Sequence, residues 1–136
     1  MSMFCYQCQE TAKGTGCTVR GVCGKTDKVS NLQDLMIYTL KGIALIQQKG
    51  LEAGIRSDKA NHFTLNGLFM TITNANFDDA NFISEIKKGL ALREELKKEL
   101  GAKGVTFANL HDAATYTAET DEEIINKANA VEVGIL

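Results

Sequence analysis

The chain has 136 residues, of which 44% are apolar and 24% charged, with a formal net charge of −2, four cysteines and no proline or tryptophan. This length suits a single domain, and the composition is that of a globular protein, which excludes collagen-like and wholly disordered chains. A net charge so close to zero exerts no general attraction on nucleic acids or anionic lipids. We therefore expect neither a nucleic acid nor a membrane among its partners.

The sequence contains no recognisable targeting segment. No apolar run approaches the roughly 18–20 residues that a membrane span needs. The N-terminus, MSMFCYQC, lacks the basic and apolar regions of a signal peptide. We expect a cytoplasmic protein. In a reducing cytoplasm, cysteines gathered in one short stretch are more often metal ligands than disulfide partners.

All four cysteines lie near the N-terminus in the pattern Cys-x2-Cys-x8-Cys-x5-Cys. Glycines stand among and beside them, so we predict that residues 1–30 form a cluster-binding loop that folds back on itself. Four thiolates that converge on one point can hold a tetrahedral metal or a cubane cluster, and nearby cations would offset its negative charge. The predicted ligands are Cys5, Cys8, Cys17 and Cys23, and the predicted cations are Lys13, Arg20 and Lys25.

The spacing favours some metals over others without deciding between them. Structural zinc sites usually pair two short Cys-x2–4-Cys knuckles, and the second pair here is Cys-x5-Cys. The pattern also differs from the ferredoxin run of cysteines at x2 intervals. On spacing alone we favour an iron–sulfur cluster, with zinc as the main alternative and disulfides or free thiols after that.

The first predicted helix follows this loop. A capping box, Ser30-x-x-Gln33, is expected to start it. Its apolar positions recur from Leu32 to Ile46 at spacings of three and four residues, which is typical of an amphipathic helix. Gly50 is predicted to end it as a left-handed cap.

Three further helices are predicted. The second runs from a cap at Ser57-Asp58 to about Asn74, although its β-branched and aromatic residues leave a strand over residues 63–73 as an alternative. The third begins at Asp78 or Asp79 and runs to Leu100, closed by Gly101. A short fourth helix is predicted to follow the capping box of residues 120–123 and to end at about residue 130.

Together these elements predict an all-α fold. With no proline and short connections, we expect an antiparallel three-helix bundle over residues 31–136, preceded by the loop of residues 1–30. His62 and His111 lie in no ligand motif, so we expect ordinary surface or packing roles for both. Tyr6, between two cysteines, is expected to shield the metal centre, and the pair Asp78-Asp79 to cap a helix.

Several segments resemble a known family. The run from Phe4 to Lys25, FCYQCQETAKGTGCTVRGVCGK, is similar to the N-terminus of the hybrid-cluster proteins, which are also called prismane proteins or hydroxylamine reductases. The run from Leu32 to Ile43, LQDLMIYTLKGI, resembles the first helix of that family. DAATYT at residues 112–117 and VEVGIL at residues 131–136 also resemble family segments.

The resemblance implies a cofactor and a larger parent. It implies that Cys5, Cys8, Cys17 and Cys23 hold a [4Fe-4S] cluster. Family members are much longer, and their active site is a hybrid iron–sulfur–oxygen cluster bound by His, Glu and Cys residues of later domains. This chain has no cysteine after Cys23 and cannot build that second centre. We therefore expect it to be the first half of the N-terminal helical domain of such an enzyme.

The function implied by the resemblance is electron transfer. The chain would pass electrons from a redox donor protein to the hybrid cluster in the remaining domains, where hydroxylamine is reduced to ammonia or nitric oxide to nitrous oxide. The isolated chain should then be inactive as an enzyme. The alternatives are a stand-alone small iron–sulfur electron carrier and a zinc-stabilised helical binding module with no redox role.

Overall fold

The computed structural model describes residues 3–72 and 78–131, and it confirms the all-α fold class. Four helices form the described molecule: α1 (Asp27–Glu52), α2 (Asp58–Ile72), α3 (Asp79–Ala102) and α4 (Asp121–Ala130). Two short 3-10 turns, η1 (Ala12–Gly14) and η2 (Asp112–Ala114), interrupt the loops. The segment 63–72, for which a strand was the alternative, is helical.

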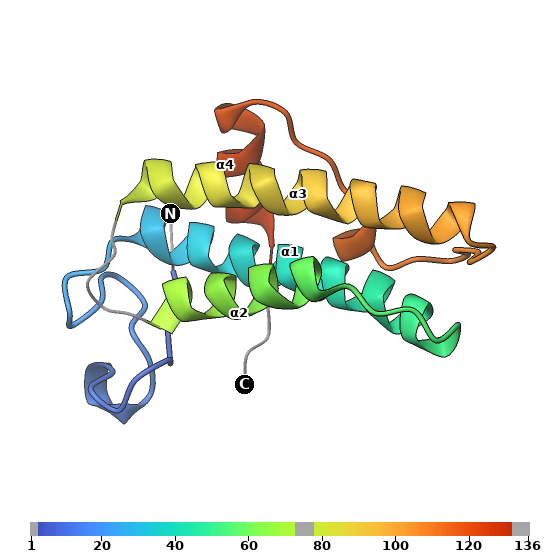
Figure 1. The fold of residues 1–136 in the computed structure, drawn as a ribbon. Coiled ribbons are helices and arrows are strands. Elements are labelled where there is room, and N and C mark those ends of the chain that lie inside the picture. The colour runs from blue at the N-terminus through green and yellow to red at the C-terminus, as the bar shows by residue number, and fades with distance from the viewer. Residues whose placement is uncertain (1–2, 73–77, 132–136) are drawn as a thin grey trace.

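The first three helices form the predicted up-and-down bundle. α1 and α2 run in opposite directions, α3 turns back again alongside α1, and α4 passes behind α3 at a steep angle to it (Figure 1). α1 is the central element, because it contacts α2, α3, α4 and η2. None of the helices in the described parts of the chain is long and apolar enough to cross a membrane.

The start of α1 differs from the prediction. Thr26 caps the helix, and its side-chain oxygen accepts the Val29 N–H at 3.2 Å. The capping box predicted at Ser30 is wrong, because Ser30 and Gln33 lie inside the helix and are buried. Beginning at Asp27 brings Val29 into the apolar core, and this tertiary packing outweighs the local capping motif.

The predicted glycine stops are also wrong, for one shared reason. Gly50 and Gly101 lie within the last turns of α1 and α3, and the left-handed positions come later, at Gly54 (φ +77°) and Gly104 (φ +88°). At each of these two helix ends, a backbone N–H donates a hydrogen bond to the carbonyl five residues earlier. The Ile55 N–H donates to the Gly50 carbonyl at 2.8 Å, and the Val105 N–H donates to the Leu100 carbonyl at 3.0 Å. Both ends are Schellman-type caps.

The other predicted caps are confirmed. Ser57 Oγ accepts the Ala60 N–H at 3.2 Å, and Asp78 accepts the N–H of Ala80 at 3.0 Å. Thr120 accepts the Glu123 N–H at 3.2 Å, and α4 ends at Ala130 as predicted. The predicted end of the second helix, at about residue 74, lies outside the described residues.

The core lies where α1 meets α2, α3 and α4. Its apolar stripe was predicted correctly, since the side chains of the stripe are almost fully buried: Leu32, Leu35, Met36, Leu40, Ile43 and Ile46. α3 adds Phe82 and Ile86, and α4 adds Ile124, all with no exposed surface. This core places the start of α1 on a rigid support, directly after the cysteine loop.

The chain between α3 and α4 is fixed to the bundle by close packing and by a buried cation. A Cβ placed on Gly42 would lie 1.9 Å from the Ala113 carbonyl oxygen, so the backbone of η2 rests directly on α1. Arg93, fully buried in α3, donates to the carbonyls of Ala113 at 3.1 Å and Tyr116 at 2.6 Å. These bonds pair the buried guanidinium with otherwise unsatisfied carbonyls.

Candidate metal centre

The cysteine loop is positioned by a short backbone pairing. Cys5 and Cys17 exchange two hydrogen bonds, with N···O distances of 3.0 and 2.9 Å, so two of the four predicted ligands lie side by side. The chain turns back between them through Gly14 and Gly16, which have φ of +67° and +128°. A Cβ on Gly16 would lie 2.5 Å from Phe4 Cε2, so glycine is required there on two grounds.

Cys17 is the most enclosed of the four thiols. Its side chain is buried, and its Sγ accepts the Ala12 N–H at 3.4 Å. The backbone N–H of Ala12, followed by that of Val22, lowers the pKa of the Cys17 thiol below its ordinary value. Burial opposes this shift and the charge of Lys25 assists it. The two backbone N–H groups thus stabilise the thiolate relative to the thiol, and the thiolate is the metal-binding form of cysteine.

Lys25 is buried against Cys5. Its side chain is 2% exposed, and Nζ lies 3.4 Å from Cys5 Sγ and 3.2 Å from Gln7 Oε1. Lys13 and Arg20, the other two cations predicted to offset the charge of the metal centre, are exposed. A buried ammonium is costly without an anionic partner. In this loop, the sulfur of Cys5 lies within hydrogen-bonding distance of that ammonium.

The remaining two ligands lie nearer the surface. Cys8 is half-buried and Cys23 is exposed, and all four cysteines are free thiols. Gly21 donates its N–H to the Lys25 carbonyl at 2.8 Å, which closes a turn around Cys23. A Cβ on Gly21 would lie 3.2 Å from Cys23 Sγ and 2.9 Å from Lys25 Cβ. The missing side chain leaves room beside the sulfur.

The described residues hold no group of three or more His, Cys, Asp or Glu side chains arranged to bind a metal. The backbone thus brings Cys5 and Cys17 together but does not assemble the predicted set of four. The donor set nevertheless fits an iron–sulfur cluster, since it consists of four soft thiols with backbone N–H groups directed at sulfur and glycines that leave space beside it.

Asp34 is a charged group beside the loop that sequence reasoning missed. It lies on α1, one residue before the fully buried Leu35, and burial raises its pKa to about 6 against an opposing effect of Lys25. The sequence does contain a signal for Asp34, because it is the only charged residue in the run of residues 29–40. Its electrostatic coupling to Lys25 links the bundle to the cysteine loop.

The histidines have the ordinary roles that were expected. His111 Nδ1 accepts the Ala113 N–H at 3.1 Å and so caps η2, while its ring packs edge-on against Tyr38. His62 is exposed on α2. Tyr6 is 45% exposed, and its shielding role stays a prediction.

The segment DAATYT holds the bundle together at a polar junction. Asp112 accepts hydrogen bonds from the Tyr38 hydroxyl and from Lys127, both at 2.7 Å, which ties α1 to α4. The pKa of Tyr38 is raised to about 12, first by burial and then by its bond to Asp112. The Asp112 pKa is lowered, chiefly by Lys127. This junction is structural and lies within the bundle.

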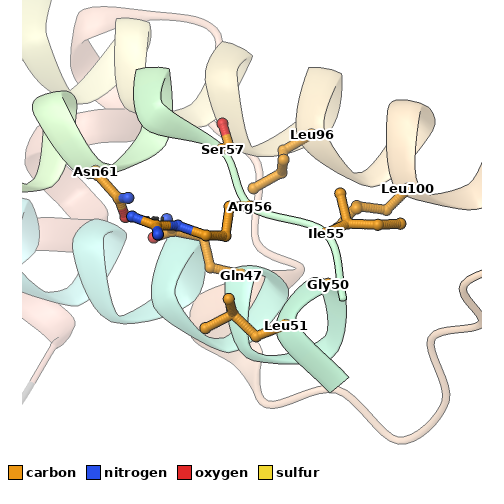
Figure 2. Close-up of a pocket in the computed structure, with 9 residues that line it drawn as sticks. All are labelled: Gln47, Gly50, Leu51, Ile55, Arg56, Ser57, Asn61, Leu96 and Leu100. Carbon is orange, nitrogen blue, oxygen red and sulfur yellow. Dashed lines mark hydrogen bonds between the residues drawn. The ribbon is translucent and has the colours of Figure 1, made fainter. Parts of the chain in front are cut away.

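A cavity of about 340 Å³ lies at the turn between α1 and α2. Figure 2 shows the Arg56 side chain extending across it towards Gln47 and Asn61, whose amides are joined by a 2.7 Å hydrogen bond. Leu96 and Leu100 of α3 form its apolar wall. The cysteine loop lies at the opposite end of the bundle (Figure 1), so this cavity is separate from the candidate metal centre.

Comparison with known proteins decides the family. A family model described as Prismane/CO dehydrogenase family matches residues 3–135. The chain belongs to this family. Members of the Prismane/CO dehydrogenase family are metal-cluster proteins, which agrees with the cysteine-rich loop.

Three relatives named hydroxylamine reductase extend the comparison. The chain is 57% identical over 137 residues to one from Desulfitobacterium hafniense (strain DSM 10664 / DCB-2), which covers all of this chain. It is 54% identical over its whole length to one from Thermoanaerobacter pseudethanolicus, and 53% identical over 98% of its length to one from Acetivibrio thermocellus. The chain spans about a quarter of the length of each of these relatives.

Proposed function

We propose that this chain is the cluster-binding electron-transfer module of a hydroxylamine reductase-type oxidoreductase. Cys5, Cys8, Cys17 and Cys23 hold a [4Fe-4S] cluster, which when bound supplies a redox centre whose irons are all ligated by sulfur. The cysteine loop that precedes α1 carries this centre, and the helical bundle that begins with α1 supports it. A redox donor protein delivers the electrons, in the cytoplasm.

The observation that carries the proposal is the burial of Lys25 against Cys5. A lysine that is 2% exposed, with its ammonium 3.4 Å from a thiol sulfur, suits a site that becomes strongly anionic when occupied. The bond from the Ala12 N–H to Cys17 Sγ adds a second stabilising contact to sulfur. Hydrogen bonds and cations of this kind tune the potentials of iron–sulfur clusters.

The catalytic step belongs to the rest of the polypeptide. The chain covers about a quarter of relatives named hydroxylamine reductase. We propose that the remaining domains carry the hybrid iron–sulfur–oxygen cluster. There hydroxylamine is reduced to ammonia, or nitric oxide to nitrous oxide, with the electrons that this module supplies. Reduction of a bound substrate needs an open metal position, and four thiolate ligands leave none at a [4Fe-4S] centre.

The test is anaerobic purification of the chain followed by two measurements. Dithionite reduction should give the electron paramagnetic resonance signal of a reduced [4Fe-4S] cluster. Turnover of hydroxylamine with reduced viologen should be absent in this chain and present in the full-length Desulfitobacterium hafniense relative. Turnover near the full-length rate would move the active site into these 136 residues. A chain that holds zinc and no iron would instead support a zinc-stabilised binding module.

A further inference from the structure

The outer face of α2 is apolar in a way that its neighbours are not. From Ala60 to Ile72 the helix contains no Asp, Glu, Lys or Arg, whereas the outer surface of α3 is rich in them. A contiguous exposed patch of large apolar side chains marks a surface that another part of a protein or a partner covers. In the described molecule, α2 is covered on one side only.

Four large side chains form this exposed face. Leu65 is 66% exposed, Leu68 44%, Phe69 63% and Ile72 60%. They stand at positions i, i+3, i+4 and i+7, so they follow one stripe along the helix. The apolar spacing of the second predicted helix would place Leu68 and Ile72 on its buried face, whereas both are exposed in the structure.

The inner face explains this reversal. The residues that α2 buries are small, namely Ala60, Gly67 and Thr71. A Cβ on Gly67 would lie 2.7 Å from Met36 Cε and 3.0 Å from Leu40 Cδ1, so α2 packs closely on α1 through its small residues. This close packing directs the large apolar side chains outward. Figure 1 shows α2 on one side of α1, while α4 crosses behind α3 on the other.

We propose that the stripe formed by Leu65, Leu68, Phe69 and Ile72 is an intramolecular interface, which packs against the remaining polypeptide of the full-length protein. The chain covers about a quarter of its relatives, so three quarters of such a polypeptide lie outside it. Permanent interfaces are apolar and poor in charge, like a domain core cut in half. A stripe of four large apolar side chains without a charge fits that kind of contact. The inference does not depend on the metal centre.

The test compares this chain alone with a chimera, in which the chain replaces the matching segment of the Desulfitobacterium hafniense relative. Hydroxyl-radical footprinting measures the oxidation of exposed side chains. Phe69 should be oxidised in the isolated chain at every concentration and be protected at least about tenfold in the chimera. Val19, which is 85% exposed and lies outside the stripe, reports the general level of oxidation.

Two substitutions provide a matched pair. Phe69→Lys and Asn66→Lys add the same charge at exposed positions of α2, on and off the stripe. In the isolated chain both should leave Tm within about 2 °C, because neither removes buried contacts. In the chimera, Phe69→Lys should lower Tm by about 5 °C or more and Asn66→Lys should not.

Two results would overturn the inference. Equal oxidation of Phe69 in the isolated chain and in the chimera would show that the remaining polypeptide does not cover this face of α2. Protection that rises with the concentration of the isolated chain, together with a dimeric mass, would assign the face to a second copy. If the chimera does not fold, the test is the binding of the isolated chain to the remaining part of the relative. Phe69→Lys must then weaken this binding about tenfold, while Asn66→Lys leaves it unchanged.

Discussion

Lys25 and Arg93 are buried cations of the described chain, and they differ in their partners. Arg93 donates to two backbone carbonyls and to Glu94, so its charge is satisfied within the bundle. Lys25 contacts Gln7 Oε1 and Cys5 Sγ. From the sequence, Lys13, Arg20 and Lys25 were all predicted to offset the charge of the metal centre. Their positions in the sequence do not show which of the three side chains is buried. The fold separates them.

Lys25→Met should lower the reduction potential of the bound cluster. Reduction adds a negative charge, which a buried cation beside Cys5 Sγ stabilises, and removing that cation should shift the potential downward by roughly tens of millivolts. Optical redox titration of the reconstituted protein measures this shift. Lys13→Met, at an exposed position, is the control and should change the potential much less. Equal shifts in the two variants would remove the special role of Lys25.

Asp34 should make stability fall as pH rises. Its pKa is about 6 in the folded chain and near 3.8 in the unfolded chain, because burial disfavours the ionised form. The folded state is therefore most favoured below the unfolded pKa, and this contribution is lost as pH rises from about 4 through 6. Asp34→Asn should be more stable than the wild type at pH 8 by about 1 kcal/mol and differ little at pH 4. Urea unfolding at the two pH values measures this, and a gain of equal size at both would contradict it.

At the scale of elements, the sequence predicted what periodicity and local caps determine. The α1 stripe from Leu32 to Ile46 and the caps at Asp78 and Thr120 are confirmed. The ends of α1 and α3 were wrongly predicted at Gly50 and Gly101, because each of these glycines is followed by a second one, Gly54 or Gly104. Only the backbone geometry shows that the second glycine of each pair is left-handed. The contact of η2 with α1 was not predictable, since hydrophobic periodicity says nothing about backbone packing onto Gly42.

Gly42→Ala should destabilise the bundle strongly. Its Cβ would lie 1.9 Å from the Ala113 carbonyl oxygen, which is backbone and held by Arg93, so η2 must move away from α1. We expect a loss of about 2–4 kcal/mol in the free energy of unfolding. Gly101→Ala is the control, because nothing lies within 4 Å of its Cβ and the helix gains about 0.5–1 kcal/mol. Denaturant unfolding compares the two, and equal effects would show that the close approach is absent.

At the scale of the whole molecule, the bundle should stand without the metal. Its core cluster is built by residues of α1, α2, α3, α4 and the segment before α4, and it contains no cysteine. The start of α1 is capped by Thr26 and not by a cysteine of the loop. Circular dichroism of the metal-free chain should therefore keep the helical signal of the loaded chain, unlike that of a small zinc finger. A random-coil spectrum of the metal-free chain would show that the cluster organises the entire fold.

The proposed metal centre is one cluster held by Cys5, Cys8, Cys17 and Cys23. The most direct measurement is the iron and acid-labile sulfide content per chain after anaerobic reconstitution, for the wild type and for each of the four Cys→Ser variants. We predict about four irons and four sulfides in the wild type and a marked loss in every variant. One zinc with no sulfide, or full cluster content in all four variants, would contradict the account.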